Sequence, residues 1–272
     1  MKSAYLEPGV HPVEMPRVAR IGDDEVYTSC DKKKKYCGGF LGTISPVAIN
    51  PLTQMLLNGL AASWHFNAGT TTFPADFGPY NLFAFGTLSI VAGKLLNAVE
   101  IQTNEALSGD NLESVFTFDD GLFTWHMWIK FSVLPSAGSE DILYKAANNG
   151  GYILRLASTG QLTFFTGNGA SYDSVVWGSN LSINTWYQIV CGRDANNLYV
   201  QVNTESVLGV VASSPSAAYI PPSPIQNFNI PATPPGHTMN FLLDELISWS
   251  RFLSLAERTF LWNNGIGLAY PF

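Results

Sequence analysis

The most constraining feature of the sequence is an alternation of large apolar side chains between residues 123 and 131. Every second position is apolar: Phe123, Trp125, Met127, Ile129 and Phe131. Successive side chains of a β-strand point to opposite faces, so this spacing places all five on one face of a strand. Trp128 points to the other face. The segment therefore predicts a central strand of a sandwich, with both faces of its sheet partly covered.

Other segments also carry the composition of strands and turns. The 24 glycines and 16 prolines indicate frequent turns between short strands. The stretch from residue 213 to 238 is rich in proline, which excludes it from a central strand position. The predicted segments are a strand at 141–145, a hairpin of 151–156 with 161–165, a second hairpin of 186–191 with 198–202, and one short strand at 225–230.

One helix is predicted, after the last strand. Ser254 and Glu257 have the spacing of a capping box, in which the two side chains satisfy unpaired backbone donors of the first turn. An apolar stripe follows and ends at Asn263–Gly265. With no other helix expected, the chain is predicted to be all-β, an antiparallel two-sheet sandwich with one short C-terminal helix.

The first residues differ from the rest and predict an extended N-terminal arm over residues 1–54, followed by one domain over 55–272. Prolines at 8, 12 and 16 disfavour a helix. Residues 25–28 and 40–44 are predicted to pair as a hairpin. Its tip carries Lys32, Lys33, Lys34 and Lys35, for which two interpretations stay open: a solvated loop, or an electrostatic contact that joins an acidic neighbouring subunit during assembly.

The sequence has three cysteines, two of which lie in the arm, and the redox state of those two stays open. Cys30 and Cys37 lie on either side of the lysines and are close enough in sequence to bridge, although free thiols are the expectation in a reducing compartment. Cys191 lies in an apolar strand pattern and is expected to be a small buried side chain.

Charge and hydropathy exclude several classes of function. The net charge of −7 argues against a general nucleic-acid binder, which normally has a basic face. The sequence predicts no membrane span, because no apolar run is long enough. The N-terminus also lacks the apolar run of a secretory signal. We therefore expect a protein assembled in the host cytoplasm and released by lysis, with an extracellular location as the alternative.

Several landmarks occur in an order typical of one superfamily. They are Ala62 to Phe66, Gly93 to Ala98, Phe123-Thr124 to Trp128, Gly151-Tyr152 to Phe164, Asn184-Thr185-Trp186, and Asp244 to Trp249 followed by Leu253 to Glu257. Together they resemble the laminin G-like domains of the concanavalin A-like jelly-roll (lectin/glucanase) superfamily. The resemblance implies a jelly roll over residues 55–272. Val202-Asn203-Thr204 and Pro231 depart from the pattern, both in turns.

The acidic residues do not have the spacing that hydrolysis of a glycosidic bond needs. Retaining glycosidases hold two carboxyl groups about 5 Å apart on one face. The acids here are adjacent in sequence and are expected to point to opposite faces: Asp119-Asp120, Glu140-Asp141 and Asp244-Glu245. The resemblance implies a structural role for Asp244 and Glu245. Histidines 11, 65, 126 and 237 are scattered, and no nucleophile elbow is present. We expect no enzymatic activity.

Binding of a glycan or of calcium remains open. A glycan site needs an exposed aromatic ring beside amides and carboxylates; the candidates are Asn168, Tyr172, Asp173, Trp177 and Tyr219. The alternative is that these aromatic residues belong to the core. The resemblance also implies a calcium ion at the rim, for which the candidates are Asp119, Asp120 and Asp194. The alternative is that these aspartates hydrogen-bond within their own turns, so that no cofactor is needed.

Two classes of function follow. The first is a non-catalytic structural and adhesive protein of a virion (a phage capsid decoration, head fibre or tail component). It would join other structural subunits in an oligomeric assembly and contact host glycans. The second is a free carbohydrate-binding module or a glycoside hydrolase of the same superfamily. The second predicts a secretion signal or an attached catalytic domain, so we favour the first.

Overall fold

The structure is a computed structural model that describes residues 19–21, 24–26, 50–69, 71–109, 116–204, 212–216, 218–224, 226–232 and 236–272. The chain divides into two compact units, Met1–Ala48 and Ile49–Phe272. In the first unit, β1 (Ala19–Ile21) pairs with β2 (Asp24–Val26) in antiparallel fashion. The predicted strand 25–28 overlaps β2, and its partner β1 was not predicted. The expected partner at 40–44, the two cysteines at 30 and 37, and Lys32–Lys35 lie outside the described residues.

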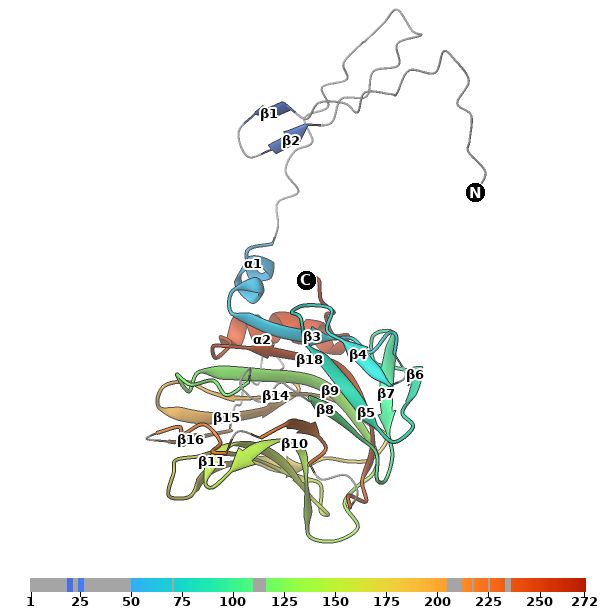
Figure 1. Ribbon diagram of the computed structural model, residues 1–272, viewed down its shortest axis with the longest axis vertical. Helices are drawn as coiled ribbons and strands as arrows, with labels where there is room; N and C mark the ends of the chain where they lie inside the picture. The colour runs from blue at the N-terminus through green and yellow to red at the C-terminus, as the bar shows by residue number, and fades with distance from the viewer. Residues whose placement is uncertain are drawn as a thin grey trace, which may run out of the picture. The chain divides into compact units, whose positions relative to one another are not determined.

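The second unit is an antiparallel sandwich of two sheets, which confirms the predicted all-β jelly roll (Figure 1). The β10 sheet, named after one of its strands, has the order β13-β12-β11-β10-β17-β8-β5-β4 among the described residues. Its strands are β4 (Thr72–Pro74), β5 (Asn81–Phe85), β8 (Ala106–Gly109), β10 (Ser139–Ala147), β11 (Gly150–Ala157), β12 (Gln161–Gly167), β13 (Tyr172–Asn180) and β17 (Phe228–Ile230).

The β9 sheet has the order β16-β15-β14-β9-β18-β7-β6, and β3 also pairs with β18. Its strands are β3 (Leu60–Trp64), β6 (Ser89–Ala92), β7 (Asn97–Ile101), β9 (Phe123–Val133), β14 (Trp186–Arg193), β15 (Asn197–Val202), β16 (Ala212–Pro215) and β18 (Asn240–Trp249). Both predicted hairpins are present, as β11 with β12 and β14 with β15.

The core lies between the two sheets and is built largely from aromatic side chains. The five alternating residues of β9 are fully buried in it, as predicted. Trp125 stacks on Phe228 of the opposite sheet with the ring centres 4.7 Å apart. On the other face of β9, Trp128 is also buried and stacks on Trp262. The strand is therefore covered on both sides.

Two helices cover the outer face of the β9 sheet. α2 (Leu255–Trp262) begins with the predicted capping box between Ser254 and Glu257 and leads into the 3₁₀ helix η1 (Asn263–Gly265). The expectation of a single helix was wrong, because α1 (Pro51–Leu57) forms where the arm was predicted to continue. Asn50 caps the first turn of α1 and proline is favourable at its first position, so this proline begins a helix.

The strand in the proline-rich stretch is also placed differently from the prediction. β17 lies between β10 and β8, in the interior of the β10 sheet. It spans three residues, and Pro231 follows its last one, so no proline interrupts the ladder. The proline that does end a strand in this stretch is Pro215, on the edge strand β16. No helix in the described part of the chain is long and apolar enough to cross a membrane.

Candidate functional site

The outer face of the β10 sheet carries a row of side chains in register across its strands. Leu143, Leu154 and Phe164 point into the core, so their neighbours along each strand point outward. Cross-strand partners share one face of a sheet. The outward row, from β5 to β13, is Phe83, Ser108, Asn229, Tyr144, Ile153, Phe165 and Ser174.

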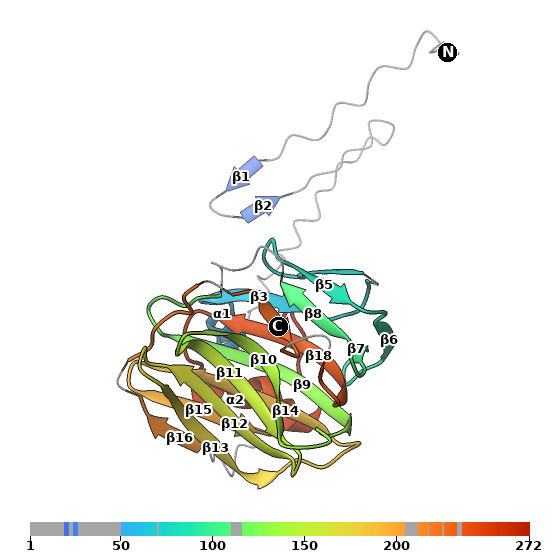
Figure 2. The same cartoon turned by 60° about the horizontal axis from the view of Figure 1, so that its bottom comes forward.

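This face lies opposite the two helices. Figure 1 shows α1 and α2 on one side of the second unit and β10 and β11 on the other. Figure 2, turned so that this lower side comes forward, brings β10, β11, β12 and β13 toward the viewer. Tyr144 and Phe165 are half-buried, and Ile153 between them is buried. The face thus presents aromatic rings on rigid strands.

An ion pair lies beside the row. Arg155 of β11 donates to Asp141 of β10 from Nε (2.5 Å to Oδ1) and from Nη2 (3.1 Å to Oδ2). The guanidinium also lies over the ring of Phe165, 5.2 Å from its centre. The hydrogen bond with Asp141 raises the pKa of Arg155 above its ordinary value. Bidentate pairing and stacking together hold this arginine in one orientation.

Two tyrosines complete the group. Burial and the nearby Asp141 raise the pKa of Tyr144, and burial and Tyr144 raise the pKa of Tyr172. Both hydroxyls are therefore protonated at neutral pH and can donate hydrogen bonds. Tyr172 donates to the carbonyl of Gly150 at 3.3 Å. It is the predicted glycan candidate that lies near Tyr144 and Arg155, both of which affect its pKa.

Four members of this group were not predicted from the sequence: Tyr144, Phe165, Arg155 and Asp141. The alternation within the predicted β11–β12 hairpin does mark Arg155 and Phe165 as positions opposite the core-facing residues. It does not show that they lie together with Tyr144 and Asp141, because that depends on the pairing of β10 with β11.

Asn168 and Asp173 are also brought together, but in an internal network. Asn168 Nδ2 donates to Asp173 Oδ1 at 3.1 Å, and Ser216 Oγ donates to Asp173 Oδ2 at 2.8 Å. Arg193, which is buried, donates from Nη1 to Ser216 Oγ at 2.9 Å. Both oxygens of Asp173 therefore have partners within the protein. The network ties β13 to the segment after β16.

Tyr219 and Trp177 both contact the interior of the protein. The Tyr219 hydroxyl donates to the carbonyl of Thr117 at 2.6 Å, and its ring lies under the guanidinium of Arg193. Burial raises the pKa of Tyr219 well above its ordinary value. Trp177 is half-buried and packs against the core.

The three calcium candidates have the geometry of turn residues. Asp194 Oδ1 accepts from the backbone N–H of Asn196 and Asn197, each at 2.8 Å, and its Oδ2 accepts from the Tyr199 hydroxyl. Asp120 Oδ1 accepts from the N–H of Leu122, and Asp119 is exposed. Within the described ranges, no group of three or more His, Cys, Asp or Glu side chains is arranged to hold a metal ion.

Asp244 and Glu245 are buried in the β9 sheet. Asp244 Oδ2 accepts from the backbone N–H of Lys94 and Leu95, and Glu245 Oε2 lies 3.3 Å from His65 Nε2. The expected alternation fails at this point. The pairing of β18 with β9 shifts after Asp244, and Glu245 has a φ of 50°. A bulge of this kind redirects a side chain.

Asp244, Glu245, His65 and His126 form a buried cluster, and burial is the main cause of the shifted pKa of each. It raises the pKa of Asp244 to about 6 and, with the charge of Asp244 added, the pKa of Glu245 to about 9. Burial also lowers the pKa of His126 to about 4, and its Nδ1 lies 3.2 Å from the carbonyl oxygen of Glu245. His65 likewise has a lowered pKa because it is buried.

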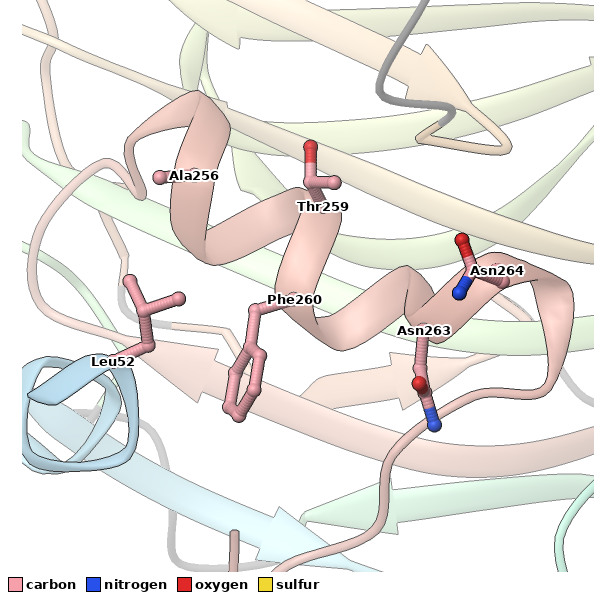
Figure 3. A pocket seen from close by; sticks show the side chains of 6 residues that line it. All are labelled: Leu52, Ala256, Thr259, Phe260, Asn263 and Asn264. Atoms are coloured by element: carbon pink, nitrogen blue, oxygen red, sulfur yellow. The ribbon is translucent and has the colours of Figure 1, made fainter. Parts of the chain in front are cut away.

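A hollow with a volume of about 490 Å³ lies between α1 and α2. Figure 3 shows Leu52 of α1 and Phe260 of α2 beside each other in this hollow. Its remaining lining residues are Ala256, Thr259, Asn263 and Asn264. None of these six side chains is charged. Because α1 and α2 lie on the side of the second unit opposite β10 and β11, the hollow does not adjoin the β10-sheet face (Figure 1).

Solved structures similar to this one share the fold at low sequence identity. The binding domain of botulinum neurotoxin DC, in complex with SialylT, is 12% identical with a TM-score of 0.59, over 76% of this chain and 52% of that one. The binding domain of Paraclostridial Mosquitocidal Protein 1 is 15% identical with a TM-score of 0.62, over 79% and 53%. A Trypanosoma rangeli sialidase is 14% identical with a TM-score of 0.58, over 77% and 33%.

The chain thus spans about half the length of the toxin binding domains and a third of the sialidase. No curated protein sequence matches it. A sequence profile described as the Concanavalin A-like lectin/glucanases superfamily matches residues 104–257, which contain strands β9 to β15 of both sheets and the capping box of α2. This chain belongs to the concanavalin A-like lectin/glucanase superfamily.

Proposed function

We propose that the chain is a non-catalytic adhesive and structural protein that binds glycans through the outer face of the β10 sheet. The observation that carries the proposal is the row containing Tyr144 and Phe165, with the Arg155–Asp141 ion pair beside it. Sugar rings have apolar faces that pack on aromatic rings, and hydroxyl groups that hydrogen-bond to charged and amide side chains. Binding sites commonly combine apolar surface with a few placed polar groups in this way.

Related folds support a role in recognition. One neurotoxin binding domain of this fold was solved with SialylT, and cell entry of botulinum neurotoxin type C, another protein of this fold, depends on interaction with two ganglioside molecules. These statements concern those proteins. They support glycan recognition by a domain of this architecture, and the choice of face in this chain depends on its own side chains.

The placement of the acids supports a function without catalysis. Asp244 and Glu245 are fully buried or nearly so, and they contact backbone donors and His65. Asp141 is engaged by Arg155, and Glu140 accepts hydrogen bonds from Thr238 and Met239. Release of sugar from any oligosaccharide by the purified chain would contradict this part of the proposal.

We also propose that the chain is a virion component, assembled in the host cytoplasm, whose N-terminal arm joins other subunits. The net charge of −7 and the Lys32–Lys35 run support this, because a cluster of positive charge on an otherwise acidic chain favours contact with another copy or another acidic subunit. Replacing the four lysines by serine in the full chain should prevent incorporation into particles. Normal incorporation would contradict the assembly role.

A glycan array probed with the full chain tests the binding function. The variants Tyr144→Ala and Phe165→Ala should each weaken binding about fivefold to tenfold, since each removes one stacking contact. Trp186→Ala is the matched control, because Trp186 is a half-buried aromatic residue on the outer face of the other sheet. Thr259→Ala tests the hollow between the helices. Loss of binding in either control, with the β10-sheet variants unaffected, would overturn the proposed site.

A further inference from the structure

The spacing of the two rings sets the direction and minimum length of a ligand. Tyr144 on β10 and Phe165 on β12 both pair with Ile153 on β11, so they lie in one row with a single strand between them. Neighbouring strands are about 4.8 Å apart, which separates the two backbone positions by about 10 Å. A single sugar ring covers one aromatic side chain. A ligand that contacts both must therefore be a chain of sugar residues that crosses the strands.

The charged side chains beside the row, Arg155 and Asp141, have opposite charges and form one ion pair. Arg155 and Asp141 are joined by two hydrogen bonds, and the side chain of Asp141 is only 15% exposed. The members of the row between β8 and β13 are Ser108, Asn229, Tyr144, Ile153, Phe165 and Ser174, none of which is charged.

An acidic sugar is disfavoured by this arrangement. Asp141 engages Nε and Nη2 of Arg155 and neutralises its charge. The carboxylate of an acidic sugar would therefore have to displace Asp141, or approach the Nη1 side of the guanidinium, where Asp141 repels it and offsets the attraction of the arginine. A neutral sugar avoids both costs, because its hydroxyl groups can hydrogen-bond to the outer atoms of the pair while the pair stays closed. The ends of the row supply further polar groups, since Asn229 flanks Tyr144 and the exposed Ser174 flanks Phe165.

We infer that the β10-sheet face selects an uncharged oligosaccharide of at least two residues that runs across the strands, and that the Arg155–Asp141 pair excludes acidic sugars. This inference rests on the proposed glycan-binding function and specifies its ligand class. It distinguishes the chain from the toxin domain that was solved with SialylT, whose fold it shares.

The test uses the full chain on an array of matched glycan pairs: N-acetyllactosamine chains of increasing length, β1,4-linked glucose chains, and the same chains ending in sialic acid or a uronic acid. The neutral member of each pair should bind about tenfold more tightly. Affinity should also increase from the monosaccharide to the disaccharide. Tighter binding of the acidic members, or equal binding of mono- and disaccharides, would overturn the inference while leaving glycan binding in place. Binding to no glycan would overturn both.

The variant Asp141→Asn gives a gain-of-function test that general instability would not imitate. It keeps the shape of the side chain and removes the charge that occupies Arg155, so the preference should shift toward the acidic members by about tenfold. Asp120→Asn is the matched control, since it removes an equal charge from an exposed turn. An unchanged preference in Asp141→Asn, with binding retained, would show that the pair does not exclude acidic sugars.

Discussion

Asp244 on β18 accepts a hydrogen bond from the backbone N–H of Lys94, 150 positions earlier in the chain, at 2.8 Å. The same oxygen accepts from Leu95 at 3.0 Å. Gly93, which precedes them, lies so close that a Cβ there would come within 2.6 Å of this carboxylate. This contact gives a physical reason for two of the sequence landmarks: the segment Gly93 to Ala98 supplies the backbone donors, and the segment Asp244 to Trp249 supplies the acceptor. The aspartate anchors the turn between β6 and β7.

Replacing this aspartate should lower the stability of the fold. Asp244→Ala would leave two partly buried backbone donors without their partner, at a cost of about 2–3 kcal/mol in the free energy of unfolding. Asp244→Asn keeps an acceptor oxygen and should cost less. Urea unfolding of both variants checks this order. Equal stability of Asp244→Ala and the parent protein would refute the anchoring role.

Glu245 should make the protein less stable as the pH rises above 7. Its pKa is about 9 in the fold, against about 4.3 in an unfolded chain, so the folded state binds the extra proton between these values. Stability therefore falls as pH rises through this window. The lowered pKa values of His65 and His126 reduce stability only as the pH falls below about 6.5, and the raised pKa of Asp244 acts mainly below 7.

The range from pH 7 to pH 9 thus isolates Glu245 within this cluster. Glu245→Gln carries no titrating proton, so its unfolding free energy should vary less over this range than that of the parent protein. Urea unfolding at several pH values measures both slopes. A variant with the same slope as the parent would mean that Glu245 is already ionised at pH 7.

The capping box should make a measurable contribution to α2. Ser254 Oγ accepts from the N–H of Glu257, and the Glu257 carboxylate accepts from the N–H of Ser254. Ser254→Ala should cost about 1 kcal/mol, the usual value for losing an N-cap. Ser158→Ala, in an exposed turn, is the control. A loss no larger than that of the control would show that packing alone holds the helix.

Calcium should have no effect on stability. Asp194 already accepts three hydrogen bonds, so its oxygens have partners without a metal ion. The melting temperature should be the same in calcium and in a chelator, because an ion that binds only the folded state would raise it. An increase with calcium that Asp119→Asn, Asp120→Asn or Asp194→Asn removes would establish a rim site instead.

Local patterns predicted those parts of the fold that depend on neighbours in sequence. The alternation in β9 identified its buried face, and the spacing of Ser254 and Glu257 identified the start of α2. Local patterns failed for α1, because the prolines at 8, 12 and 16 led to the prediction of an extended arm as far as residue 54. Pro51 follows a capping asparagine, and there a proline favours a helix.

The candidate site could be predicted only in part. Tyr172 was identified as an aromatic residue near polar groups, but its other proposed partners, Asn168 and Asp173, are engaged with Ser216 and with each other. Phe165 and Arg155 are outward positions of a hairpin that the sequence did predict. They lie next to Tyr144 and Asp141 because of the register between β10 and β11, which includes a shift at Asp141. The sequence pattern did not predict that register.

By itself the sequence determined the class of the fold, its strand periodicity and the resemblance to one superfamily. These depend on residue spacing, which constrains a backbone locally. Only the tertiary structure decided which strands are neighbours, with β17 between β10 and β8, and which face each site residue occupies. Those choices depend on pairings between residues far apart in the chain, and on register shifts such as the one after Asp244, which exchange one face of a strand for the other.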